Sequence, residues 1–231
     1  FPITSETISE SENKYLEPWI QWYSFYTELS YRDHKVFHLG DCLKHNHKTI
    51  FDKKFKNKEI GIFGSMNLSP NNRFKIYIPD PWTEVKSDSS FASRMVSDAI
   101  RKVVNSNVKL RISLYQIIGI LYLVGVPKSL TDIRNLILGT SAFFRKYRDK
   151  IASYFDLYFV NYCLRSIKKN KLDISFIFLN GFAHVQHHYL LDSEFHDGEN
   201  PDWYSNKNID SIHRSLIIYD KLFDKVLKNC G

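Results

Sequence analysis

The sequence contains few cysteines. Only three occur among its 231 residues, Cys42, Cys163 and Cys230. They lie far apart and form no CxxC pair, so the sequence predicts neither a disulfide framework nor a cysteine zinc site. Sparse, unpaired cysteines favour a reducing compartment and hence a cytoplasmic location.

Targeting and membrane-spanning segments are missing from the sequence as well. The first residues, FPITSETISESENKY, lack a basic region followed by an apolar one. They also lack an initial Met, so we expect part of the natural N-terminus to be missing. The longest apolar stretch, residues 112–126, is too short for a usual membrane span and is interrupted by Gln116. It predicts a buried helix or hairpin.

Nucleic-acid-binding motifs are also lacking, although the formal net charge is +7. A basic chain suits a polyanionic partner. The basic residues are scattered, however, apart from clusters at residues 53–58 and 168–171, both beside predicted element ends. No RNA-recognition, helix-turn-helix or zinc-finger pattern accompanies them, so solvated surface is the better interpretation.

Short apolar runs alternate with helical patterns along the chain. The runs typical of buried strands are residues 59–63, 74–78 and 173–179. Apolar residues recur at helical spacing in residues 18–29, 48–56, 90–170 and 209–227, and Pro127 divides the long pattern.

This order of elements predicts an α/β fold. Helices alternating with apolar strands are typical of three α/β/α layers around a mostly parallel sheet. We interpret residues 1–231 as one incomplete domain, with a helical insertion at about residues 88–147.

The clearest chemical signal directly follows the predicted strand at residues 173–179. Asn180 and His184 come there, with His187 and His188 in the next helical turn. Ligands of open α/β sheets bind beyond the carboxyl ends of the strands, which is where these residues come. Imidazole side chains can bind zinc or a similar ion. His184 and His188 are four residues apart and would share a helix face. Surface or packed histidines are the alternative, and Val185 excludes the HExxH pattern.

A second histidine group lies nearer the N-terminus. Its members are His34, His38, His45 and His47, with Asp33 and Asp41 among them. Mixtures of Asp and His suit divalent metals. The spacing is loose, so a solvated loop is the better interpretation of this group.

Three further side chains are candidates for the chemistry. Ser24 and Thr27 can act as nucleophiles only if a neighbour activates them. Asn67 follows the strand at residues 59–63 and would contact a substrate anion, although asparagine in a loop is also a common turn residue.

Three segments together resemble a known family. Residues 26–37, YTELSYRDHKVF, look like the TGL-x-P-x-x-H-G-I segment of type I phosphodiesterases and nucleotide pyrophosphatases, in the alkaline phosphatase/sulfatase superfamily. Asn180-x-x-x-His184 is similar to their D-x-x-x-H metal motif. The helix at residues 209–227, with Asp210, Tyr219 and Asp220, resembles their D-x-x-Y…D helix. The likeness covers residues 15–65 and 170–228, in the same order.

The resemblance implies two divalent metals, zinc or manganese, flanking a Thr or Ser nucleophile. It makes His184 a metal ligand and puts Asn180 in a carboxylate-ligand position, and the nucleophile position falls near Glu17 or Pro18. His188 and His34 are further metal-ligand candidates, and Asn180, His187 and Asn67 are candidate substrate contacts.

The sequence departs from this family at several positions. Asn180 replaces Asp, Glu28 replaces the glycine of TGL, and no DHG occurs in the chain. The loss of a carboxylate weakens a divalent site. We therefore expect an excised middle of a longer protein, from a divergent or inactive branch.

The favoured function is a metal-dependent hydrolase or transferase acting on phosphate or sulfate esters of glycans or nucleotides. A catalytically inactive relative that binds a ligand or partner is the alternative. A third class, carbohydrate recognition, rests on the aromatic content of 15% and on Trp19, Trp22, Trp82 and Trp203. Ring-rich packing in the core and in clefts is the better explanation of the aromatic content. The sequence makes no prediction about oligomeric state.

Overall fold

The chain folds into two compact units. The computed structural model describes residues 12–88, 90–105, 113–127, 130–144, 148–204 and 210–230. Unit 1 combines residues 1–119 with 170–178, and unit 2 combines residues 120–169 with 179–231. Parallel strands with accompanying helices confirm the α/β class.

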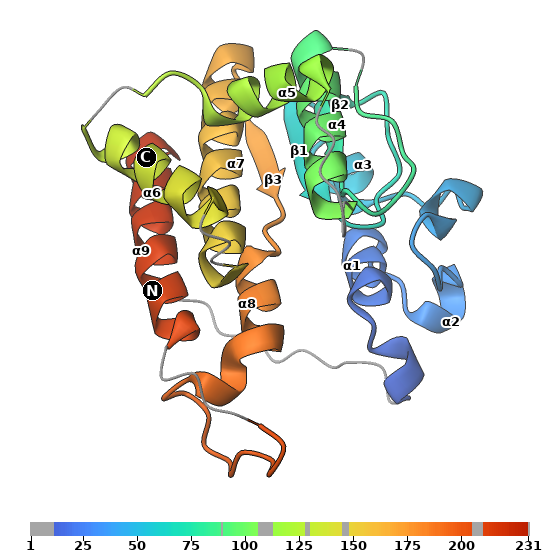
Figure 1. Cartoon of the computed structure of the whole chain (residues 1–231). Coiled ribbons are helices and arrows are strands. Elements are labelled where there is room, and N and C mark those ends of the chain that lie inside the picture. Colours follow the sequence, from blue (N-terminus) through green and yellow to red (C-terminus); the bar gives the residue numbers. More distant parts are fainter. Residues whose placement is uncertain are drawn as a thin grey trace. The chain divides into compact units, whose positions relative to one another are not determined.

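Unit 1 contains a three-stranded sheet in the order β2-β1-β3, and all its pairs are parallel (Figure 1). Its strands are β1 (Ile60–Ser65), β2 (Phe74–Pro79) and β3 (Ile174–Ile177). Every residue of β1 is buried because this strand has a neighbour on both sides, which explains its unbroken apolar run. All three strands were predicted. The third was predicted to be a buried strand, but β3 has one strand partner and is half-buried along its length.

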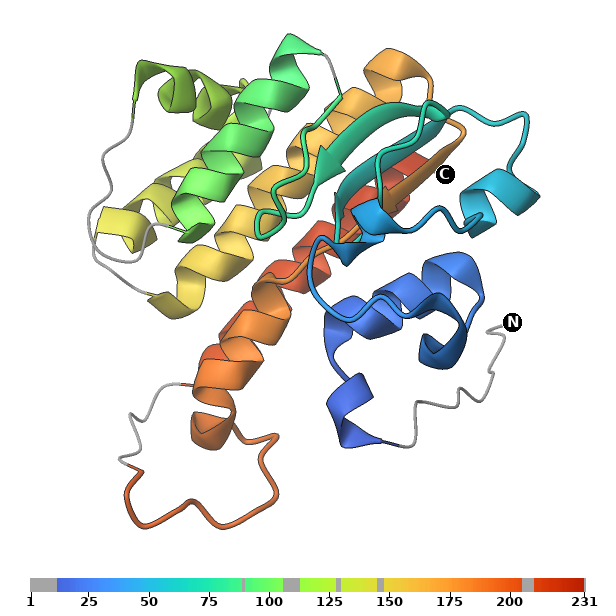
Figure 2. The ribbon, with the colours of Figure 1, turned by 90° about the vertical axis from the view of Figure 1, so that its right-hand side faces the viewer.

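Unit 1 also contains four described helices. They are α1 (Pro18–Thr27), α2 (Tyr31–His34), α3 (Ile50–Lys54) and α4 (Phe91–Asn105), with 3-10 turns at Asn13–Tyr15 and Asp41–Lys44. α1 begins with Pro18 at its first position, as the sequence predicts. α3 begins with a capping box between Thr49 and Asp52. Figure 2 shows α3 and α4 on opposite sides of the strands.

The core of unit 1 is rich in aromatic rings. Trp22 of α1 and Phe55 beside α3 pack against a cluster of buried residues. The members of that cluster are Tyr26, Phe51, Ile60, Ile62, Leu68, Phe74, Tyr77 and Val85. Much of the high aromatic content is therefore core packing.

Unit 2 is helical and is organised around α7. Its helices are the end of α5 (Leu114–Val124), α6 (Leu130–Phe144), α7 (Arg148–Asn170), α8 (Gly181–Tyr189) and α9 (Ser211–Cys230), with a 3-10 turn at Leu190–Asp192. Two side-chain hydrogen bonds join α7 to α9, one between Ser153 and Ser215 and one between Asp156 and Tyr219. Because both residue numbers increase together, the two helices run in the same direction.

Some apolar side chains that the sequence pattern predicts to be buried are exposed in the structure. α9 buries Ile212, Tyr219 and Leu222 as the spacing predicts, but Leu216 on the same predicted stripe is exposed. The apolar stretch at residues 112–126 forms α5, yet much of it is exposed rather than buried. The predicted insertion at residues 88–147 contains α4 to α6, and its residues 89, 106–112, 128–129 and 145–147 lie outside the described part of the chain.

Candidate functional site

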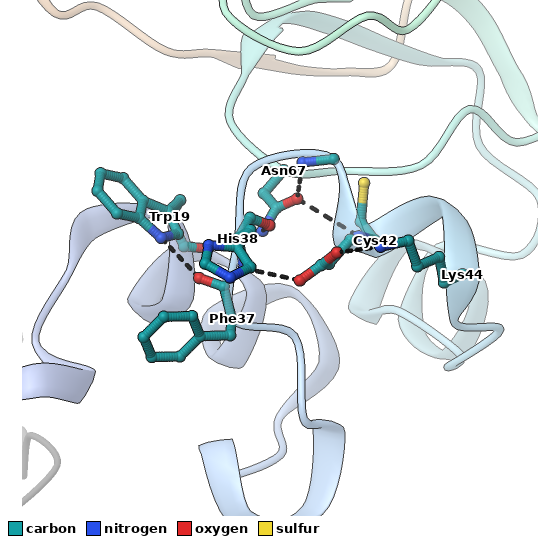
Figure 3. A network of polar contacts seen from close by, with 8 residues as sticks. Trp19, Phe37, His38, Cys42, Lys44 and Asn67 are labelled. Carbon is teal, nitrogen blue, oxygen red and sulfur yellow. Dashed lines mark hydrogen bonds and ion pairs between the residues drawn. The ribbon is translucent and has the colours of Figure 1, made fainter.

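Asn67 follows β1 and ties three segments of unit 1 together. Its side-chain oxygen accepts hydrogen bonds from the backbone N–H groups of Gly40 (3.0 Å) and Cys42 (3.5 Å). Its amide nitrogen donates to the carbonyl oxygens of Trp19 and His38, each at 3.2 Å. Figure 3 shows Asn67 at the centre of this network. An asparagine amide has two acceptor and two donor positions, and all four are used here.

The backbone at Asn67 is also constrained. Its φ of 55° lies in the left-handed region, which asparagine tolerates better than most residues. Its N–H donates to the carboxylate of buried Asp80 (3.3 Å), which also accepts from Trp82 and Thr83. Asn67 therefore closes the loop after β1, and its predicted contact with a substrate anion would have to displace one of these bonds.

Glu17, the residue predicted near the nucleophile position, caps the start of α1. Its side chain is exposed and forms no capping hydrogen bond, while its carbonyl oxygen accepts from Ile20 and Gln21. The start of a helix favours anions through its unpaired N–H groups. A carboxylate at this position repels an anionic ester, and the nucleophilic role of Glu17 remains a prediction.

His34 is fully buried, and its two ring nitrogens both form hydrogen bonds. Its Nδ1 accepts the N–H of Val36 (3.0 Å), which places the ring proton on Nε2 of the neutral imidazole. Nε2 then donates to Ser24 Oγ at 2.9 Å. His34 in this tautomer cannot take a proton from Ser24. A metal would also have to break one of these bonds, so the metal-ligand role predicted for His34 stays without support.

The other predicted nucleophile and two of the four tryptophans, Trp19 and Trp22, are engaged in hydrogen bonds or core packing. Thr27 Oγ1 is buried and donates to the carbonyl oxygen of Tyr23 (2.8 Å). Trp19 donates its indole N–H to the carbonyl oxygen of Phe37 (2.7 Å). Trp82 and Trp203 are exposed, and sugar stacking by them is untested.

Unit 1 contains a pocket of about 160 Å³ that we call the histidine pocket. Its lining residues are Tyr23, His45, Asn46, His47, Lys48, Thr49, Asp52, Leu68, Ser69, Pro70, Asn71 and Phe74. The His45 and His47 rings stack, with centroids 5.6 Å apart and planes within 12° of parallel. Two histidines, one lysine and one aspartate are therefore among the residues that line this small cavity.

Hydrogen bonds fix two other members of the histidine pocket. Burial raises the pKa of Tyr23 to about 12, so its hydroxyl stays protonated and can donate to His47 Nδ1 at 3.2 Å. In that arrangement the ring proton of neutral His47 lies on Nε2. Burial opposes ionisation of Asp52, but hydrogen bonds from Thr49 and Asn71 and the charge of Arg73 outweigh it and lower the pKa of Asp52. Asp52 is thus an ionised, structurally occupied carboxylate.

In unit 2, α8 carries the histidines that follow β3 in the sequence. Asn180 occupies the N-cap position, but its side chain forms no cap. Asp156 of α7 replaces it and accepts the N–H of Gly181 at 2.7 Å. Tyr219 of α9 accepts the N–H of Phe182 (2.8 Å) and donates its own hydroxyl to Asp156. A buried carboxylate and a tyrosine therefore fix the start of α8.

His184 and His188 lie next to each other on α8, as their spacing predicts. Their ring centroids are 4.6 Å apart, and both side chains are exposed, as is His187. Partial burial and the neighbouring His188 and His187 lower the pKa of His184. The neutral imidazole is favoured as a result, and this is the form that binds a metal.

The donor set on α8 is incomplete as a metal centre. Protein zinc sites use three or four ligands from the chain. Within the part of the chain that the structure describes, no group of three or more His, Cys, Asp or Glu side chains could hold a metal ion. His184 and His188 supply two of the required ligands, and Asn180 supplies no anionic one, so we assign no catalytic step to a metal.

Sequence reasoning overlooked several of these residues. Asp156 is a lone acidic residue in the apolar stretch SYFDLYFV, which is the kind of signal that marks a buried polar contact. The roles of Lys48 and Asn71 in the histidine pocket depend on how the loops fold and leave no comparable pattern in the sequence.

Comparison of the chain with protein-family models, with curated proteins and with solved structures returned no match.

Proposed function

We propose that this protein binds a phosphate or sulfate ester and is a divergent relative of the type I phosphodiesterases. One observation supports this beyond the motifs themselves. The backbone of residues 27–36 has special conformations at the positions where the TGL-x-P-x-x-H-G-I segment has glycine or proline.

Both glycine positions of that segment correspond to residues with positive φ. Glu28, in place of the first glycine, has a φ of 61°, and Lys35, in place of the second, has a φ of 58°. Glycine adopts this left-handed region without the steric cost that a Cβ brings. Only two other described non-glycine residues, Asn67 and Lys171, have positive φ. The segment therefore keeps a backbone suited to glycine after the glycines have been replaced.

The proline position fits the same pattern. Tyr31 stands where the segment has proline, and it is the first residue of α2. Proline is favoured at this position because its missing N–H has no helical partner to lose. Three independent backbone positions thus support a shared ancestry with the family.

The histidine pocket is the site we propose for the anionic group of the ester. Its volume of about 160 Å³ suits a phosphate or sulfate group better than a whole glycan or nucleotide. His45, His47 and Lys48 line the pocket and carry donors for such a group. The ionised carboxylate of Asp52 accepts hydrogen bonds from Thr49 and Asn71.

The geometry favours a protein that binds the ester without hydrolysing it. The nucleophile position holds Glu17 and Pro18, and neither offers a hydroxyl. Ser24 accepts a hydrogen bond from His34 and is not activated by it. Covalent catalysis needs a nucleophile beside a base that can take its proton.

The test is a titration of the protein with p-nitrophenyl phosphate and p-nitrophenyl sulfate, followed by calorimetry. Lys48→Ala should weaken binding by roughly tenfold, because a charge-assisted hydrogen bond is lost. Lys168→Ala, on an exposed part of α7, is the matched control and should leave the affinity unchanged. Equal affinity of Lys48→Ala and the unaltered protein would contradict the pocket assignment.

A metal-dependent hydrolase or transferase is the second candidate, favoured by the adjacent His184 and His188 and by the lowered pKa of His184. It predicts hydrolysis of bis-p-nitrophenyl phosphate or p-nitrophenyl sulfate in the presence of zinc or manganese. Turnover that disappears in His184→Ala but survives in His213→Ala would establish this candidate over binding alone.

A further inference from the structure

The end of α5 and the outer side of α6 expose large apolar side chains in unit 2. Val126 and Leu130 are 82% and 85% exposed, and Leu121 and Ile137 are each above 60%. We call the full set the apolar face: Leu121, Tyr122, Val126, Leu130, Ile133, Ile137 and Leu138. Contiguous apolar patches on a folded chain usually mark an interaction surface.

Helical spacing places three members of the apolar face on one side of α6. Gly139 packs so closely on α7 that a Cβ there would collide with the Tyr158 hydroxyl. Leu130, Ile133 and Ile137 lie on the side of α6 opposite Gly139, given about 100° of rotation per residue. Their exposure therefore follows from how α6 packs against α7.

Hydrogen bonds from α7 hold both parts of the apolar face in place. Tyr158 donates to the carbonyl oxygen of Asn135 in α6 (2.9 Å). Arg165, two turns further along α7, donates to the carbonyl oxygens of Tyr122 and Leu123 at the end of α5. A spacing of seven residues places Tyr158 and Arg165 on the same side of α7, so α5 and α6 are anchored to one surface.

Positive charge is concentrated in the same stretch of sequence. Residues 101–150 contain ten Lys and Arg against two Asp, a formal charge of +8, while the whole chain has +7. The remaining 181 residues are therefore nearly neutral. No charged residue occurs between Arg111 and Lys128, so basic residues flank an uncharged apolar run.

We propose that the apolar face docks on an anionic lipid surface. Apolar side chains enter the boundary between headgroups and acyl chains, and the Lys and Arg that flank them in the sequence, with exposed Arg134 on α6, attract anionic lipids. A second copy of the chain would bring another strongly positive segment against the first, which like-charge repulsion opposes. Exposed Arg134 on α6 and aromatic Tyr122 suit the headgroup level of such a surface.

Docking in the membrane plane also fits the helix lengths. In the described residues, no helix combines the length and the apolar character needed to cross a membrane. α5 has 11 residues and α6 has 15, so each would lie along the surface rather than traverse it.

Sedimentation with lipid vesicles tests the proposal. The full chain should bind phosphatidylcholine vesicles containing about 30% phosphatidylserine, and bind pure phosphatidylcholine much less. The double variant Ile133→Ser/Ile137→Ser should lower the partition coefficient at least about tenfold, because two branched apolar side chains leave the interface. Raising the salt concentration from about 0.1 M to about 0.5 M should weaken binding as well.

The matched control is Phe223→Ser/Leu227→Ser, which removes two exposed apolar side chains from α9 in the same unit. It should bind like the unaltered chain, and circular dichroism confirms that both variants are folded. Equal vesicle binding by the Ile133/Ile137 variant and the control would overturn the proposal. So would absence of vesicle binding combined with a dimer, seen by analytical ultracentrifugation, that only the Ile133/Ile137 variant loses.

Discussion

Asp156 is the residue on which the start of α8 depends. Helices usually begin with a capping side chain from the residue just before them, but Asn180 does not cap α8. Asp156, which lies 25 positions before Gly181, accepts the Gly181 N–H instead. Tyr219 donates a hydrogen bond to the Asp156 carboxylate. Burial raises the pKa of Asp156 to about 6, although hydrogen bonds from Tyr219 and Gly181 act in the opposite direction.

The raised pKa predicts a specific dependence of stability on pH. Between about pH 4 and pH 6 the unfolded chain ionises Asp156 while the folded chain retains its proton. The free energy of unfolding should therefore fall as pH rises through this window, by roughly 3 kcal/mol from this group, and then level off. Urea denaturation of the protein and of Asp156→Asn at several pH values measures the difference. Parallel profiles for the two proteins would show that Asp156 is ionised normally.

Lys35 offers a test of the backbone argument for family resemblance. Its φ of 58° strains any side chain with a Cβ, so Lys35→Gly should be more stable than Lys35→Ala by about 1 kcal/mol. Both variants lose the amine, and only the glycine variant relieves the backbone. Thermal or urea denaturation compares them, and an alanine variant at least as stable as the glycine variant would contradict the interpretation.

At the scale of elements, sequence periodicity predicted which segments are helices and strands but not how deeply they are buried. β1 and β3 have similar apolar runs, yet only β1 is covered on both edges. α5 contains no charged residue, yet Leu121 and Tyr122 are exposed. Periodicity reports local conformation, whereas burial depends on neighbours distant in the sequence.

α8 gives an element-scale prediction through its first residue. A Cβ at Gly181 would lie 2.6 Å from the carbonyl oxygen of Ala152 and 2.7 Å from the Asp156 carboxylate. Gly181→Ala should push the start of α8 away from α7 and destabilise the protein by roughly 1–3 kcal/mol, as overpacking does. Gln186→Ala, at an exposed position of the same helix, should change stability little. Urea midpoints measure both, and similar values for the two variants would refute the tight fit.

At the scale of the whole chain, the order of elements was predictable and the site was not. Strand runs and helical spacing are local signals, and they identified the α/β class. The histidine pocket joins residues 23, 45–49, 52, 68–71 and 74, which only the fold brings together. The histidine pair on α8 was predictable because four-residue spacing is itself a local property, while its anchor Asp156 comes from a different helix.

The position of β1 has a consequence for how the chain is made. Ile60 pairs with Phe74 on one side and with Ile174 on the other. During synthesis the first partner emerges 14 residues after Ile60, whereas the second emerges 114 residues after it. Throughout that interval a strand with the apolar run Ile60–Phe63 has an open edge, which is a template for pairing with other nascent chains. Folding of this sheet should therefore be slow and dependent on protection of that edge until residue 177 has been translated.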